Sequence, residues 1–224
     1  MVGPNGAGKS SLIRAALALE RVKSGDVCLD GVHVTSLGAR ERAARIGWLA
    51  QSSPIEEGLL VLESVAAARF RFRETRAASM EVARASLAEV DAHGLESVRL
   101  DRLSGGELQR VRLAALVAQE AELWLLDEPG NHLDPSLQLA LCAILVKQVQ
   151  QGRGVLVVTH DLAVLPFLRH STTRVVAMRE GAIVFEESLD SPRLAERLSD
   201  LYSVVVHRVD VGGMPRFVLG GTAS

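Results

Sequence analysis

A glycine-rich segment at the start of the chain limits the possible folds more than any other part of the sequence. Residues 3–10 read Gly-Pro-Asn-Gly-Ala-Gly-Lys-Ser and fit the phosphate-binding pattern G-x-x-x-x-G-K-[ST]. Glycines let successive backbone N–H groups point inward around phosphate oxygens. The helix expected over residues 9–18 directs its positive N-terminus at the same place. A glycine-rich turn before an ordinary helix is the alternative, but the full match to the pattern favours a phosphate site.

The pattern also assigns chemistry to particular side chains. Lys9 is expected to reach the β- and γ-phosphates of a triphosphate, and the Ser10 hydroxyl is expected to ligate Mg²⁺. The nucleotide-binding residues expected in this segment are Gly3, Pro4, Asn5, Gly6, Ala7, Gly8, Lys9, Ser10 and Ser11.

The phosphate-binding segment begins unusually close to the first residue. Such a loop follows a buried strand, yet only Met1 and Val2 precede this one. An unpaired position in the middle of a sheet would leave backbone groups without hydrogen bonds. We therefore expect the first strand to come from sequence upstream of Met1.

Composition excludes several classes of protein. The 224 residues suffice for one domain or two subdomains, and a net charge of −2 is not that of a dedicated nucleic-acid binder. The longest apolar runs fall far short of a membrane span of roughly 20 residues, and no signal peptide precedes the loop. Cys28 and Cys142 stand in apolar surroundings, which predicts two buried thiols in a reducing compartment.

The sequence Leu-Ser-Gly-Gly-Glu at residues 103–107 is a second candidate anion site. Ser104 followed by Glu107 fits a capping box that opens a helix, and taken alone this is simply a good helix start. Gly105 and Gly106 are unfavourable inside a helix, so they need another reason. They leave backbone N–H groups bare at a positive helix end, which suits an anion.

Polar side chains follow three predicted strands, over residues 46–50, 123–126 and 155–158. They are Gln51, the pair Asp127 and Glu128, and His160. Ligands bind at the edge where parallel strands end. Asp127 can hold Mg²⁺, and Glu128 can polarise an attacking water. The alternatives are an ordinary acidic strand exit and a structural histidine, but the phosphate loop favours chemistry.

Arginine alternates with phenylalanine over residues 69–73, a pattern that also occurs on nucleic-acid and lipid surfaces. With no wider basic surface, a solvated helix end with one or two buried Phe side chains is favoured. The other predicted elements are a hairpin over residues 27–35, helices over 40–45, 61–70, 79–93 and 105–118, a helix capped by Asp134, strands over 173–178 and 183–185, a helix over 192–198 and a terminal hairpin over 204–219.

The order of these motifs resembles the ATP-binding subunit of an ABC transporter, and the likeness spans nearly the whole chain. The resemblance implies an α/β fold with a RecA-like P-loop NTPase core over residues 1–51 and 117–190. It implies an inserted helical subdomain with the signature motif over residues 52–116 and a C-terminal extension over residues 191–224. The first strand or strands of that core are missing from the chain as given.

The resemblance also implies a head-to-tail dimer with two ATP molecules sandwiched between the subunits. In one subunit, Lys9, Ser10 and the loop backbone would hold the phosphates and Mg²⁺, and Asp127 would support the metal. Glu128 would be the general base and His160 would bind the γ-phosphate.

Two further groups of residues carry roles that the resemblance implies. Gln51 would contact Mg²⁺ or the attacking water and relay the state to the membrane partner. Asp134 would pass signals across the dimer. The γ-phosphate held by the other subunit would be reached by Ser104, Gly105 and Gly106. Glu107 is also expected among the nucleotide-binding residues.

The expected partners are a second copy of the chain, transmembrane permease subunits and, indirectly, a periplasmic or extracellular binding protein, with no nucleic acid. The expected location is the cytoplasmic face of the inner (plasma) membrane, as a peripheral subunit. Residues 42–51, 131–134 and 201–219 look like those of importers of iron-siderophore, haem or cobalamin ligands.

The sequence departs from the family pattern at a few positions. The aromatic residue that stacks on adenine upstream of the loop has no counterpart in the chain as given, Gly130 stands where Thr or Ser is usual, and Ala115 stands where Arg is common. Two alternatives stay open, a soluble ABC ATPase that acts on ribosomes or DNA and a truncated cassette that binds a partner without efficient hydrolysis. Intact Lys9, Glu128 and His160 argue against the second, whereas the missing first strand argues for it.

Overall fold

The computed structural model describes residues 1–51, 54–55, 57–131 and 133–222. The helices are α1 (Lys9–Ala16), α2 (Ala39–Arg45), α3 (Val61–Ala67), α4 (Arg76–Glu89), α5 (Gly105–Gln119), α6 (Pro135–Gln150) and α7 (Leu194–Tyr202), with 3₁₀ segments η1 (Val34–Ser36), η2 (His93–Leu95), η3 (Leu100–Arg102) and η4 (Leu162–Leu168). The strands are β1 (Cys28–Leu29), β2 (Val32–His33), β3 (Ile46–Leu49), β4 (Leu123–Asp127), β5 (Gly154–Val158), β6 (Arg174–Arg179), β7 (Ala182–Ser188), β8 (Val204–Val211) and β9 (Met214–Thr222).

A parallel sheet in the order β3-β4-β5 forms the centre of the molecule. Successive side chains of a strand point to opposite faces. In β4, Trp124 and Leu126 are buried in the core cluster that includes α5 and α6, whereas Leu125 is buried with Ile13 of α1. Burial on both faces explains why this strand is apolar at successive positions rather than at alternate ones.

Met1 and Val2 join this sheet to the β6–β7 pair. The Met1 amino group donates to the Val157 carbonyl at 2.5 Å, and the Thr159 N–H donates to the Met1 carbonyl at 3.1 Å. On the other side, Val2 forms a parallel bridge to Ala177 in β6. The two residues therefore take the sheet position from which the phosphate-binding loop departs. A cavity of about 350 Å³ lies next to Met1 between β5 and β6.

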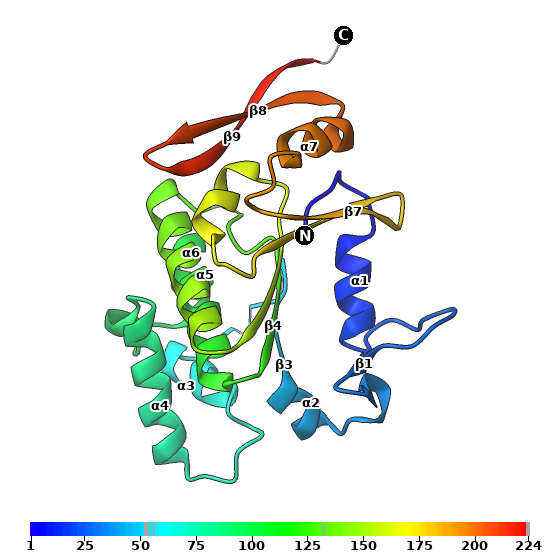
Figure 1. Ribbon diagram of the computed structural model, residues 1–224. Coiled ribbons are helices and arrows are strands. Elements are labelled where there is room, and N and C mark those ends of the chain that lie inside the picture. The colour runs from blue at the N-terminus through cyan, green and yellow to red at the C-terminus, as the bar shows by residue number, and fades with distance from the viewer. Residues whose placement is uncertain (52–53, 56, 132, 223–224) are drawn as a thin grey trace.

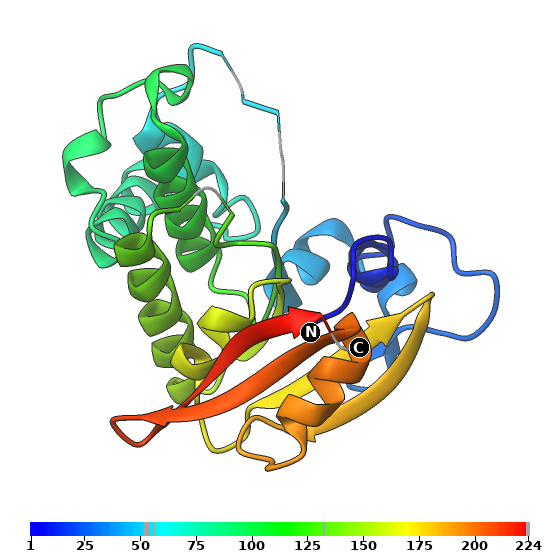
Figure 2. The same ribbon diagram turned by 90° about the horizontal axis from the view of Figure 1, so that it is seen from above.

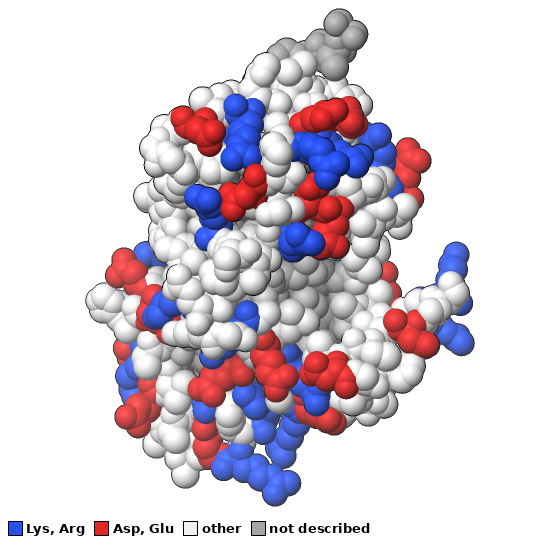
Figure 3. Space-filling view, in the orientation of Figure 1, with Lys and Arg blue, Asp and Glu red and all other residues white. Residues whose placement is uncertain are grey.

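Helices cover both faces of the central sheet. In Figure 1, α5 and α6 lie on one side of β3 and β4, and α1 lies on the other. Together with α5, the helices α3 and α4 form a helical lobe that stands apart from α1 in the view from above (Figure 2). α7 and the β8–β9 hairpin close one end of the molecule and share a core cluster with η4, β6 and Val2. Charges of both signs are interspersed over the face in Figure 3.

Several local predictions are confirmed. Ser104 and Glu107 form the complete capping box of α5. Asp134 caps α6, with Pro135 as the first helical residue. The sequence Asp30-Gly31 turns β1 into β2, with positive φ at both residues, as a tight hairpin turn requires.

Other local predictions are wrong or lie outside the described residues. Cys28 is exposed, because successive side chains of a strand point to opposite faces and its neighbour Leu29 is the one that packs against the core, whereas Cys142 is buried as expected. Arg69 is not solvated but buried, and its neighbour Phe70 is exposed. Ser52, the expected start of the helical subdomain, is among the residues that the structure does not describe.

Candidate functional site

Four parallel chain segments end at the same edge of the sheet, and each carries a predicted site residue there. The phosphate-binding loop follows Val2, Gln51 follows β3, Glu128 follows β4 and His160 follows β5. Because the strands are parallel and in register, their carboxyl ends lie together. The structure thus brings these residues to one edge, as the sequence predicts.

The phosphate-binding loop holds its lysine inward. Gly6 and Gly8 have φ values of 79° and 94°, a left-handed conformation that L side chains rarely adopt. Lys9 is buried, and its ammonium donates to the carbonyls of Gly3 at 2.7 Å and Pro4 at 2.9 Å. Gly8 lies at the N-cap of α1 without a side-chain cap, so the backbone N–H groups at this helix end stay available for an anion.

Glu128 and His160 form a direct pair. A Glu128 carboxylate oxygen lies 2.5 Å from His160 Nδ1, and the Glu128 side chain is only 9% exposed whereas that of His160 is 53% exposed. Glu128 also has a φ of 54°, although it is not glycine. Non-glycine residues in this region are strained, and such strain concentrates at functional sites. The Glu128 N–H donates to the Val158 carbonyl at 2.9 Å, so the pairing of β4 with β5 continues as far as Glu128.

Asp127 suits the predicted magnesium site. It is buried, and its Oδ1 has no hydrogen-bond partner among the residues that the structure describes. A buried carboxylate oxygen without a donor is an acceptor that a cation or its water can satisfy. A site of this type needs only one or two protein oxygens, because Mg²⁺ keeps several waters and binds substrate phosphates.

The signature segment is not part of this edge. Ser104 and Gly105 are exposed at the start of α5, and the space where a Gly105 side chain would lie is open. The Ser104 hydroxyl and N–H donate to the Glu107 carboxylate at 2.6 and 2.9 Å, and these bonds lower the pKa of Glu107. Among the described residues, no hydrogen bond or ion pair joins this segment to the phosphate loop. Within one chain, the structure therefore leaves the two predicted anion sites separate.

Asp134 has a structural role within the chain, whereas Gln51 is exposed. Asp134 Oδ1 accepts from the N–H groups of Ser136 and Leu137 at 2.9 and 3.0 Å, and the Ser136 hydroxyl contributes most to lowering its pKa. Asp134 is therefore the N-cap of α6 within one chain, and its expected role in signalling across the dimer is a separate one. Gln51 is exposed after β3.

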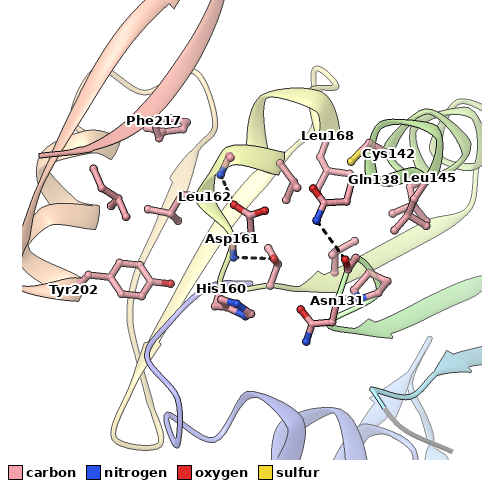
Figure 4. A pocket seen from close by; sticks show the side chains of 18 of the residues that line it. Asn131, Gln138, Cys142, Leu145, His160, Asp161, Leu162, Leu168, Tyr202 and Phe217 are labelled. Carbon is pink, nitrogen blue, oxygen red and sulfur yellow. Dashed lines mark hydrogen bonds between the residues drawn. The ribbon is translucent and has the colours of Figure 1, made fainter. Parts of the chain in front are cut away.

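A cavity of about 600 Å³ opens beside His160, and Figure 4 shows its lining. It lies between α6, η4, α7 and the β8–β9 hairpin. Tyr202, the last residue of α7, points its hydroxyl toward His160 in this view and accepts a hydrogen bond from the Gly3 N–H at 3.0 Å. Tyr202 could not be predicted from the sequence, because no motif or spacing links position 202 to position 3.

Comparisons with known proteins agree with this arrangement. The profile of the family described as ABC transporter matches residues 1–131. The ferric enterobactin transport ATP-binding protein FepC of Escherichia coli (strain K12) is 34% identical over 231 residues, which cover 100% of this chain and 84% of that protein. The hemin import ATP-binding protein HmuV of Myxococcus xanthus is 37% identical over 193 residues, which cover 82% of this chain and 71% of that protein.

A solved structure of a dimeric bacterial ABC transporter cassette superposes with a TM-score of 0.76 at 26% identity. The match covers 85% of this chain and 84% of that one.

Proposed function

The chain belongs to the ABC transporter family, and we propose that it is the subunit that binds and hydrolyses ATP to power an importer. The observation that carries this proposal is the contact between Glu128 and His160 at the sheet edge beside the phosphate loop. A carboxylate held at this edge is placed to take a proton from a water that attacks the γ-phosphate.

In the proposed reaction, the loop binds the phosphates and Glu128 handles the proton. The backbone N–H groups at the start of α1 and the Lys9 ammonium bind the β- and γ-phosphates. Mg²⁺, held by Ser10 and Asp127 with Gln51 nearby, would neutralise charge on the phosphates. His160 Nδ1 is engaged by Glu128, so in the protonated imidazole Nε2–H is left to donate to the γ-phosphate.

We also propose that the site is completed by a second copy of the chain. The N–H groups of Gly105 and Gly106, with Ser104, lie at an exposed helix N-terminus, where they are free to bind an anion from another subunit. In a head-to-tail pair, the ATP held by one subunit supplies that anion to the other. The dimeric cassette structure that this chain resembles supports such an assembly.

The proposed cargo is an iron-siderophore, haem or cobalamin ligand. The two relatives described above are named for ferric enterobactin transport and hemin import. The cargo itself would be recognised by other subunits, a transmembrane permease and, through it, a periplasmic or extracellular binding protein. The proposed location is the cytoplasmic face of the membrane that holds the permease.

No helix in the described part of the chain is both long and apolar enough to cross a membrane.

Magnesium-dependent ATP hydrolysis by the purified protein tests the proposal. Glu128→Gln keeps the shape of the side chain but removes the base, so turnover is expected to fall at least about 100-fold while ATP binding persists. Glu186→Gln is the matched control, because Glu186 is an exposed carboxylate that pairs only with Arg174, at 3.0 Å, among the described residues. Unchanged hydrolysis in Glu128→Gln would remove Glu128 from its proposed role.

Affinity purification from detergent-solubilised membranes tests the transport part of the proposal. A co-purifying multi-span permease would support an importer, and its binding protein would then identify the cargo. Ribosomal proteins or DNA factors in its place would favour the soluble ATPase. A permease found together with a wild-type chain that does not hydrolyse ATP would favour the truncated cassette.

A further inference from the structure

The first residue of the phosphate loop is held by a side chain from the far end of the sequence. Along the edge of β5, Met1 exchanges hydrogen bonds with Val157 and Thr159. Backbone groups of a strand alternate between its two sides, so the next donor on this side is the Gly3 N–H. The Gly3 N–H does not donate to β5. It donates instead to the Tyr202 hydroxyl, at 3.0 Å.

Gly3 is also fixed on its other sides. Its carbonyl accepts the Lys9 ammonium at 2.7 Å. A Cβ at Gly3 would lie 2.1 Å from the Met178 carbonyl oxygen, so the backbone approaches β6 as closely as it can. The Tyr202 hydroxyl and the Lys9 ammonium thus bind the N–H and the carbonyl of the same residue. A shift of Tyr202 would therefore act on Gly3, whose carbonyl binds the lysine of the proposed phosphate site.

Tyr202 is itself held firmly. Arg179, at the end of β6, donates to the carbonyls of Asp200 and Leu201 at the end of α7. Leu198 and Leu201 are buried in the cluster that contains Val2. Burial raises the pKa of Tyr202, and the nearby Glu128 carboxylate adds to the increase, so the hydroxyl stays protonated at physiological pH.

From this geometry we propose that Tyr202 is a positioning residue that sets the resting geometry of the phosphate loop and makes nucleotide affinity depend on the C-terminal unit formed by α7 and the β8–β9 hairpin. The inference rests on the proposed ATP site and adds a residue to it. Its consequence is regulatory. A partner that shifts α7 changes the affinity for ATP without touching the nucleotide.

Binding of a non-hydrolysable ATP analogue with Mg²⁺, measured by calorimetry, tests this inference. Tyr202→Phe removes one oxygen and keeps the ring, so the dissociation constant is expected to rise about five-fold, the effect of one neutral hydrogen bond. In turnover assays, KM for ATP rises by a similar factor while kcat stays within about two-fold.

Ser199→Ala is the matched control. This substitution also deletes one hydroxyl from α7. The Ser199 hydroxyl donates to the Ala195 carbonyl at 2.9 Å and accepts from the Val206 N–H at 2.8 Å, but it does not contact the phosphate loop. This variant is expected to lower the unfolding temperature and to bind the analogue like wild type. If Tyr202→Phe also unfolds more easily, binding is measured well below its unfolding temperature, where the protein is folded.

The outcomes are distinct. Weaker binding in Tyr202→Phe alone supports the inference. Wild-type affinity in Tyr202→Phe overturns it, and so does an equal loss in both variants, because the Tyr202 hydroxyl would then have no effect beyond that of a hydroxyl that does not reach the loop. A wild-type chain that binds no analogue contradicts the proposed function instead, so the two failures cannot be confused.

Discussion

At the scale of single residues, the two cysteines lie in opposite surroundings. Cys28 is exposed in β1, whereas Cys142 is 4% exposed in α6. Burial raises the pKa of the Cys142 thiol to about 11, and the nearby Asp161 carboxylate adds to the increase. Only the thiolate reacts with disulfide reagents. Cys142 is therefore doubly protected, by lack of access and by lack of charge.

We expect one thiol per folded chain to react quickly with an aromatic disulfide reagent at pH 8. Cys142 should react at least about 100-fold more slowly than Cys28, because it is buried and its raised pKa leaves very little thiolate at this pH. The measurement is the time course of absorbance for wild type and for Cys28→Ser. Denaturant should make Cys142 in the variant react at the ordinary rate. A fast phase in folded Cys28→Ser would contradict the prediction.

At the scale of elements, a buried arginine ties the helical lobe together. Arg69, just after α3, donates to the Glu74 carboxylate at 2.5 and 2.8 Å, to Glu120 at 2.9 Å and to the Ala118 carbonyl at 2.9 Å. These contacts join the end of α3 to the start of α4 and to the end of α5. Phe72 adds a ring face 3.8 Å from the guanidinium.

This cluster predicts a pH dependence of stability. The Arg69 hydrogen bonds lower the pKa of Glu74 from 4.5 to about 2. A carboxyl group whose pKa is lower in the folded state stabilises the fold above its unfolded pKa. That contribution is lost as the pH falls from about 4.5 to about 2. Glu74→Gln should therefore be less stable than wild type at pH 7, and the difference should shrink over this range.

Urea unfolding at a series of pH values checks the prediction. Glu81→Gln serves as control, because Glu81 is an exposed carboxylate of α4 for which the described residues offer no ion pair. It should follow wild type at every pH. A difference between Glu74→Gln and wild type that stays constant down to pH 2 would show that Glu74 does not titrate with the fold.

The same cluster shows where the sequence is a poor guide. The strands, the capping box and the Asp134 cap follow from local patterns, because each depends on residues within four positions of one another. The burial of Arg69 depends on Glu120, which is 51 residues away. Cys28 lies in an apolar stretch of sequence, but in the two-residue strand β1 it is Leu29 that packs against the core, and Cys28 stays exposed. A sequence pattern over a few neighbouring residues therefore predicts neither the burial of Arg69 nor the exposure of Cys28.

At the scale of the whole molecule, the proposed site needs a second copy of the chain to be complete. Ser104 lies exposed at the start of α5, where it would meet the other subunit's ATP. Ser104→Arg places a long charged side chain there. We expect this variant, in the Glu128→Gln background, to bind ATP as a monomer and to lose the ATP-dependent dimer. Size-exclusion chromatography with light scattering and a binding titration measure the two properties.

Ser104→Ala is the control, because both substitutions remove the helix cap, which stabilises α5 by about 1 kcal/mol. Only the arginine variant also blocks the interface. Dimer formation in Ser104→Arg equal to that of its parent would show that this helix end lies outside the interface. Dimer loss in both variants to the same extent would assign the effect to loss of the Ser104 hydroxyl and not to a blocked interface.

The order of motifs along the sequence predicts most of this site. Lys9, Glu128 and His160 are found because each follows a recognisable strand or loop. The contact of Tyr202 with Gly3 could not be found this way, because it spans 199 positions and is made by one hydroxyl. The sequence pattern of α7 shows which of its residues face the core, but not which distant residues they contact.

The left-handed backbone at Glu128 has a wider consequence. A glycine or asparagine would relax this position, so selection for robustness alone would move the sequence away from glutamate. Consensus-based or computational redesign for higher thermal stability would also favour glycine or asparagine at position 128, and this change would remove the proposed base. A stabilised version of this chain therefore has to be built around an unfavourable residue at position 128.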